Sequence, residues 1–208
     1  MAGHAHAAPG IPFWSLAFMW FGMMAAMMAP TVWPWVQAFR RISSGESGRG
    51  ATVRFASGYL VAWLGYAIGA AVLQKGLQAN ALMQASGDVV LPRSGAVIFL
   101  IAGFYQFAPL KRACLTHCRT PFGYFLRYWR NGPGSAFRMG LHHGLFCVGC
   151  CWALMGTAFA VGVMNVLWMA TLGALAVIEQ VAPYRHWPRR SIGSALVAVG
   201  IWQLATRS

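Results

Sequence analysis

The sequence predicts an all-α integral membrane protein, a bundle of about six transmembrane helices. Of its 208 residues, 58% are hydrophobic and only 9% are charged. A soluble domain carries about 25% charged residues, so this composition fits a lipid environment better than water. The apolar residues also gather into stretches of the length that crosses a bilayer. At this length the whole chain, residues 1–208, is expected to form one transmembrane domain.

Six candidate spans follow one another, each compared with the roughly 20 apolar residues that a bilayer core needs. Their approximate ranges are 12–39, 53–73, 95–110, 140–159, 162–181 and 191–205. The first lacks the basic flank and short length of a cleavable signal peptide, so it is expected to be retained. Its Pro30 should kink the helix and free backbone carbonyls in the membrane. The last is the shortest and would need local thinning or tilt to cross.

The basic residues predict an orientation. The chain has 16 Lys and Arg against three acids, and most of the basic residues lie in the first, third and fifth loops. The positive-inside rule then places these loops in the cytoplasm and both termini outside, in the inner (cytoplasmic) membrane. This excess of positive charge suits cytoplasmic loops and lipid headgroups, and no nucleic-acid-binding motif accompanies it.

The stretch HHGLFCVGCCW, which begins at His142, holds three of the five cysteines. Cys147, Cys150 and Cys151 are spaced i, i+3, i+4, which puts their thiols on one face of a helix. His143 extends the same stripe one turn earlier. His142 points about 100° away and is expected to form hydrogen bonds at the membrane interface. Nitrogen and sulfur donors on one stripe indicate a candidate soft-metal site.

Cys114 and Cys118 form a second cluster with i, i+4 spacing, on the same cytoplasmic half of the predicted bundle. Thiols that face a reducing cytosol rarely form structural disulfides. Four sulfurs suit zinc, and two or three thiolates suit Cu(I). An iron–sulfur cluster or a haem would use the same residue types. Thiol exchange and simple packing are the alternatives, and which of Cys150 and Cys151 faces the site is left open.

The first span is rich in methionine. Met19, Met23 and Met27 follow one i, i+4 ridge, and Met24 and Met28 follow the next. Thioethers are neutral, soft ligands that Cu(I) accepts inside a membrane. Methionine also fills irregular helix interfaces, so packing is the favoured role of these residues, and copper binding by Met23, Met27 and Met28 is the alternative.

Two further features are candidate metal ligands. Glu179 is the only acid well inside a predicted span, so it needs a partner, which would be Lys111, Arg112, a metal or a proton. At the start of the chain, removal of the first Met would expose Ala2, Gly3 and His4. A free amine, two amide nitrogens and an imidazole can enclose Cu(II) or Ni(II) in a square plane, and His6 adds a donor. A chance occurrence is the favoured explanation, because short motifs often arise without function.

Four segments together resemble an uncharacterised bacterial family of predicted metal-binding integral membrane proteins. They are W-x-x-M-x-x-A-M-M-x-P from Trp20, Y-x-x-x-P-L-K-x-x-C-L-x-x-C-R-x-P from Tyr105, G-x-x-x-G-x-x-C-x-G-C-C-W-x-L-M from Gly140, and M-N-x-x-W-M from Met164. The resemblance implies metal binding but no reaction. It implies that the family's motif positions are Cys114, Cys118, Cys147, Cys150, Cys151, Met27, Met28 and Glu179. One departure is Gln180, where the family pattern has Lys after Glu.

We therefore expect a membrane protein that binds a soft metal, copper ahead of zinc, and acts in metal handling or delivery. One alternative is a membrane thiol–disulfide carrier that uses Cys147-x-x-Cys150. Another is a non-catalytic subunit of a larger membrane enzyme, with its 10 Trp at an interface. The expected partners are the lipid bilayer and either a membrane cuproprotein or enzyme-complex subunits. No catalytic residue is expected.

Overall fold

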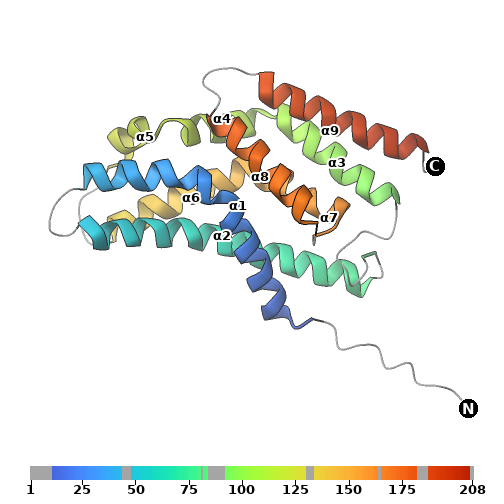
Figure 1. Ribbon diagram of the computed structural model, residues 1–208, viewed down its shortest axis with the longest axis horizontal. Coiled ribbons are helices and arrows are strands. Elements are labelled where there is room, and N and C mark those ends of the chain that lie inside the picture. The colour runs from blue at the N-terminus through green and yellow to red at the C-terminus, as the bar shows by residue number, and fades with distance from the viewer. Residues whose placement is uncertain are drawn as a thin grey trace, which may run out of the picture.

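A computed structural model describes residues 11–43, 48–80, 82–83, 92–129, 134–163, 165–181 and 187–206. Its elements are helices, with no strand element in these ranges, so the predicted all-α class is confirmed. Figure 1 shows the arrangement. The helices are α1 Phe13–Ile42, α2 Gly48–Ala79, α3 Pro92–Phe107, α4 Pro109–Arg119, α5 Pro121–Tyr128, α6 Ser135–Gly156, α7 Ala158–Val161, α8 Val166–Val181 and α9 Trp187–Thr206.

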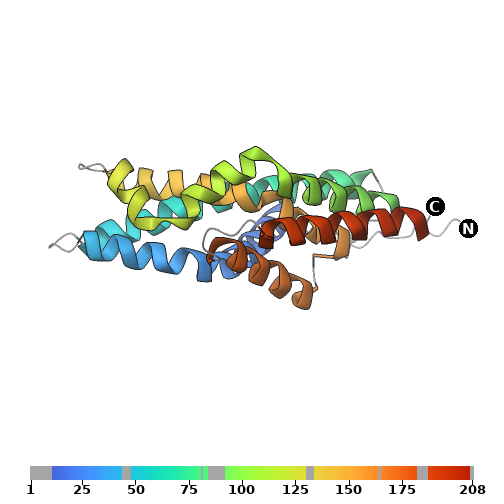
Figure 2. The ribbon, with the colours of Figure 1, turned by 90° about the horizontal axis from the view of Figure 1, so that it is seen from above.

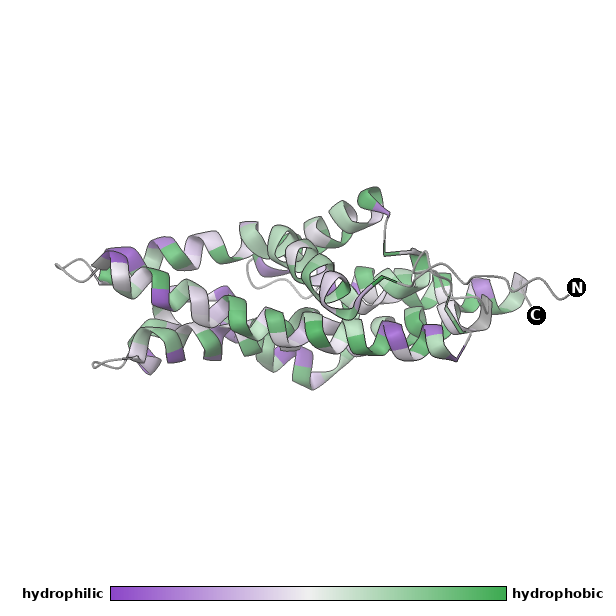
Figure 3. Cartoon of the chain, turned by 90° about the horizontal axis from the view of Figure 1, so that it is seen from below, coloured by the Kyte–Doolittle hydropathy of each residue, from purple (hydrophilic) through white to green (hydrophobic). Residues whose placement is uncertain are grey.

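Three segments of the described chain are long and apolar enough to cross a membrane: α1, most of α2, and α6 continued by α7. The bent pair of α3 and α4 would make a fourth. Helix α8 is apolar but has only 16 residues. Figure 3 shows hydrophobic residues along the length of the helices, and side chains as large as Trp14, Phe18 and Leu126 are exposed. Apolar outer surfaces of this kind suit contact with lipid.

Helix α2 packs beside both α1 and α6, and all three helices are long (Figures 1 and 2). Glycines set the spacing between α2 and α6. A Cβ at Gly140 would meet the backbone of Phe55, and one at Gly58 would meet the backbone of Phe137. Because neither glycine has a side chain, the two helix backbones approach closely. Helix α1 contains Pro30 and Pro34 and changes direction along its length, as expected for prolines inside a helix.

The third predicted span ends earlier than expected. Helix α3 stops at Phe107, and α4 leaves at an angle of 65°. Pro109 opens α4 and holds Ala108 in an extended conformation, which interrupts the helix. The cysteines at 114 and 118 therefore lie on a separate helix rather than on a continuation of the span. The inward face of α4 consists of Lys111, Cys114, Leu115 and Cys118.

Helices α3 and α9 form a second layer and run side by side in both views (Figures 1 and 2). Small residues again allow close contact, since a Cβ at Gly103 would meet Val197 and one at Gly200 would meet Leu100. Helix α8 packs against α1 and brings its last turn to α4. This arrangement places α4, the middle of α6 and the end of α8 around one buried region.

Candidate metal centre

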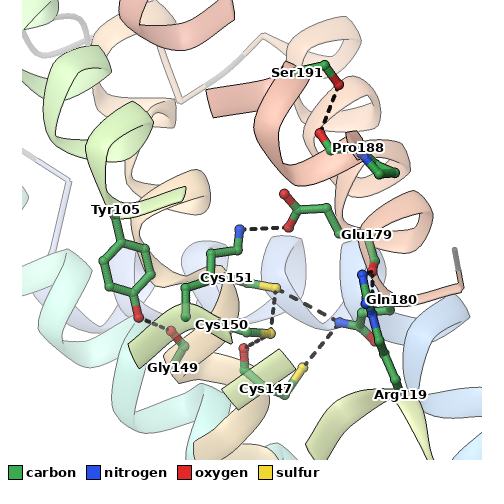
Figure 4. Close-up of polar contacts among 11 residues, drawn as sticks. Tyr105, Arg119, Cys147, Gly149, Cys150, Cys151, Glu179, Gln180, Pro188 and Ser191 are labelled. Carbon is green, nitrogen blue, oxygen red and sulfur yellow. Dashed lines mark hydrogen bonds and ion pairs between the residues drawn. The ribbon is translucent and has the colours of Figure 1, made fainter. Parts of the chain in front are cut away.

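The three cysteines of α6 are buried on one side of the helix, each with 1% of its surface exposed. The Sγ atoms of Cys150 and Cys151 are 3.3 Å apart. The Cys150 thiol donates to the backbone carbonyl of Cys147 over 3.1 Å. Figure 4 shows the three sulfurs facing the same space between helices. The helical spacing in the sequence is sufficient to explain this grouping.

Helix α4 adds a fourth thiol. The Cys118 thiol is a close neighbour of the thiols of Cys147 and Cys150 and interacts with both. Cys151 contacts the same two thiols. Four thiols from two helices that are distant in sequence therefore meet in the protein interior, and all are free cysteines.

Cys114 lies one turn before Cys118 on α4 and is also buried. Its sulfur faces Gly149, where an added Cβ would lie 3.0 Å from the Cys114 Sγ. Cys114 thus lies beside the four-thiol group rather than in its network of contacts.

The thiols meet through hydrogen bonds and packing. Within the described ranges, no group of three or more His, Cys, Asp or Glu side chains has an arrangement that could hold a metal ion. Binding would require the thiols to lose protons and draw together around the ion. Metal binding by these cysteines therefore stays a prediction.

Two polar side chains from other helices approach the thiols. The Tyr59 hydroxyl on α2 lies 3.4 Å from the Cys147 Sγ. The Gln180 Nε2 on α8 donates weakly to Cys147 and Cys151, at 3.9 Å from each sulfur (Figure 4). The sequence singled out Gln180 only as a departure from the expected family pattern, and that was the only sequence signal for it. An N–H donor here can stabilise charge on a nearby sulfur.

Glu179 pairs with Lys111, one of the partners that the sequence allowed. The Lys111 Nζ and the Glu179 Oε2 are 2.7 Å apart, and both side chains are 1% exposed (Figure 4). The other carboxylate oxygen, Oε1, is buried without a hydrogen bond. Arg119 donates to the Glu179 backbone carbonyl over 2.8 and 3.2 Å. The Lys111 ammonium is also an electrostatic neighbour of the Cys151 thiol.

His143 is buried next to this region. Its ring stacks on Trp35 with centroids 3.6 Å apart, and its Nδ1 has no hydrogen-bond partner. It is an electrostatic neighbour of Cys147. His142 points elsewhere, with its Nδ1 2.9 Å from the Tyr124 hydroxyl, so it is a hydrogen-bonding residue as expected.

The predicted methionines separate into two places. Met24 and Met28 are fully buried in the core. Met23 and Met27 line an apolar groove of about 700 Å³ between α1 and α8, together with Met19 and Met169. The structure does not gather the predicted methionines into one site, because the two ridges face different directions. Residues 2–4 of the predicted amino-terminal site lie outside the described residues.

A comparison with known protein families shows the family to which the chain belongs. A family model described as PpoB2, copper chaperone, matches residues 17–203. The chain belongs to this family. The match includes both cysteine helices, and the description supports copper as the metal and copper handling as the role. Neither the curated proteins nor the solved structures gave a match. The match is consistent with the expected metal-related family, and its description adds copper.

Proposed function

We propose that the protein handles Cu(I) as a cargo and binds it through thiolates of Cys118, Cys147, Cys150 and Cys151. The observation that carries this proposal is the meeting of four buried thiols from α4 and α6 in a member of a copper chaperone family. Two or three thiolates suit Cu(I), so four candidates leave room for a ligand to exchange as the ion moves on. The receiver would be a membrane cuproprotein or the subunit of a membrane enzyme.

The surroundings support such a site. Each thiol that binds the ion loses its proton, so the protein must tolerate negative charge on buried sulfur. The Lys111 ammonium near Cys151 and the Gln180 amide near Cys147 supply a positive charge and an N–H donor. Through Lys111, Glu179 would hold this charge in position.

The other predicted ligands would contribute to copper handling from outside the four-thiol group. Cys114 and His143 flank the thiols and would be neighbouring donors outside the four-thiol ligand set. The Met23 and Met27 thioethers in the α1–α8 groove would receive Cu(I) from within the membrane. Met28 would support the same region from the core, and residues 2–4 would form a separate site for Cu(II).

We also propose the full membrane arrangement. The chain would cross the inner membrane six times, with α8 and α9 as the last two spans and both termini outside. The three or four apolar helices and the apolar α8 support this arrangement. Helix α2 has 32 residues. At 1.5 Å per residue its length is about 48 Å, so it would extend beyond a hydrocarbon core of about 30 Å.

A membrane thiol–disulfide carrier is the second candidate. Cys118 contacts Cys147 and Cys150 across two helices, so a disulfide between α4 and α6 would need little movement. Forming it would release two electrons and two protons, so the carrier would need a disulfide partner as oxidant.

The deciding experiment is the metal content of the detergent-purified, untagged protein, kept reduced and measured by elemental mass spectrometry. We expect about one copper per chain, lost in Cys147→Ser/Cys150→Ser, since two of the thiolates that Cu(I) prefers are then absent. Zinc in place of copper would correct the metal. No bound metal, with five titratable thiols, would overturn copper handling and favour thiol exchange.

A further inference from the structure

Two histidines that the proposed thiol site does not use meet at its outer side, where α4 and α6 contact each other. The ring of His117 stacks on Phe146 with centroids 4.3 Å apart, and the ring of His142 meets the same Phe146 edge-on at 4.8 Å. Each histidine is also an electrostatic neighbour of the other. In sequence, His117 directly precedes Cys118, and Phe146 directly precedes Cys147. The imidazole pair is therefore carried by the same turns of α4 and α6 as the thiols of Cys118 and Cys147.

The hydrogen bond of His117 fixes which nitrogen carries the proton. Its Nδ1 lies 2.9 Å from the backbone carbonyl of Ala113. A carbonyl oxygen can only accept, so Nδ1 carries the hydrogen. In the neutral ring, the lone pair is then on Nε2 and is available to a metal.

His142 is fixed in the same state by a chain of two hydrogen bonds. The Tyr124 hydroxyl donates to the carbonyl of Met139 over 2.9 Å. A phenol has a single hydrogen, and this bond uses it. The hydroxyl must therefore accept from the His142 Nδ1, which lies 2.9 Å away. His142, too, presents an unprotonated Nε2.

The pair adjoins a polar pocket of about 210 Å³ between α4 and α5. Both histidines are half-buried, and the two tyrosines that contact His142 line the pocket with His117. The lining residues are Thr116, His117, Thr120, Gly123, Tyr124, Arg127 and Tyr128. The pocket has space for a hydrated ion, given that one water takes up about 30 Å³ of the liquid.

We propose that His117 and His142 form a second copper site, a transfer site through which the ion reaches or leaves the four thiols. The inference rests on the proposed function for the identity of the cargo. Imidazole nitrogen suits copper, and a histidine that binds metal through one nitrogen typically donates its other N–H to a neighbouring acceptor, as both rings do here. Neutral imidazoles release no proton when they bind, whereas the thiols must. The histidine pair is therefore suited to rapid exchange.

The first test observes the site directly. In a variant with all five cysteines changed to Ser, and with His4→Ala/His6→Ala to remove the amino-terminal motif, Cu(II) is titrated and followed by electron paramagnetic resonance. We expect a signal with coupling to imidazole nitrogen that is lost in His117→Ala/His142→Ala. A signal that survives this change would overturn the proposal. Because no thiol takes part, this test is independent of the thiol site.

The second test keeps the thiols, so it remains decisive if the cysteine-free variant does not fold. The rate of Cu(I) transfer from a coloured cuprous chelator is measured in the otherwise unchanged protein. Loss of an outer-shell partner of a metal ligand typically costs about 10–100-fold in metal affinity or activity. We therefore expect His117→Ala/His142→Ala, which removes both ligands of the transfer site, to load at least about tenfold more slowly with the final stoichiometry unchanged. An unchanged rate would overturn the transfer role. A protein that binds no Cu(I) at all would instead contradict the thiol site.

Matched tyrosine variants test the argument about the protons. Tyr124→Phe keeps the ring but removes the acceptor of the His142 N–H, so it should weaken Cu(II) binding in the first test about tenfold. Tyr128→Phe removes a hydroxyl that the site does not use and keeps the ring that contacts both histidines, so it should bind like the parent. Equal binding by the two variants would contradict the assigned role of Tyr124.

Discussion

Lys111 on α4 and Glu179 on α8 form a buried ion pair, with 2.7 Å between Nζ and Oε2 and 1% exposure on each side chain. The pair joins the cysteine-bearing α4 to the end of α8, which also carries Gln180 to the thiols. A buried pair need not add net stability, but removal of one partner leaves the other charge unpaired in the interior. The pair is therefore expected to fix the position of α4 against α8.

Glu179→Gln should lower the free energy of unfolding by about 3–5 kcal/mol, the usual cost of breaking a buried pair. The cause is the Lys111 ammonium, which would keep its burial but lose its carboxylate. The measurement is unfolding by denaturant in a mild detergent, followed by intrinsic fluorescence.

The control is Lys111→Met/Glu179→Leu, which removes both charges and keeps a similar volume. This double variant should regain most of the lost stability, since apolar replacement of a buried pair is often neutral. If Glu179→Gln unfolds like the parent, the ion pair does not hold the two helices together.

The helices and the grouping of the α6 thiols could be predicted from the sequence because both depend on local spacing. Cys147, Cys150 and Cys151 share a face through helical periodicity alone. Pro109 is a local signal for the end of α3. The apolar residues continue to position 110, however, so the predicted span runs to that residue.

Contacts between helices could not be predicted in this way. The approach of Cys118 to Cys147 depends on the 65° bend between α3 and α4, which lays α4 against α6. The role of Gln180 depends on the packing of α8, and the proton positions on His117 and His142 depend on acceptors supplied by Ala113 and Tyr124. Spacing along one helix does not specify which residue on another helix will face it.

Gly140→Ala should destabilise the protein by about 1–3 kcal/mol or more, because an added methyl would overlap the backbone of Phe55 on α2. The change in the free energy of unfolding is measured as above. Gly69→Ala is the matched control, since nothing lies within 4 Å of a Cβ added there. It should be neutral or stabilising by up to about 1 kcal/mol from helix propensity. Similar destabilisation by both would mean that α2 and α6 do not pack through Gly140.

The proposed orientation predicts the side on which single thiols react. In a background with all five native cysteines changed to Ser, Ser208→Cys should react with an impermeant maleimide added outside intact cells. Ser44→Cys, in the first predicted loop, should react only after the membrane is permeabilised, because the positive-inside rule places that loop in the cytoplasm. The reverse pattern of labelling would invert the orientation. Labelling of both from outside would contradict an odd number of spans between them.

Cys118→Ser and Cys114→Ser should differ, although the two residues lie one turn apart on the same helix face. Cys118 contacts the α6 thiols, whereas Cys114 packs against Gly149. We expect Cys118→Ser to weaken Cu(I) binding about tenfold or more, a loss of about 1.4 kcal/mol or more, and Cys114→Ser to change it less than about threefold. Competition with a cuprous chelator measures both affinities. Because both changes replace a buried thiol by a hydroxyl, general damage to the core would affect them alike, so equal losses would contradict the four-thiol site.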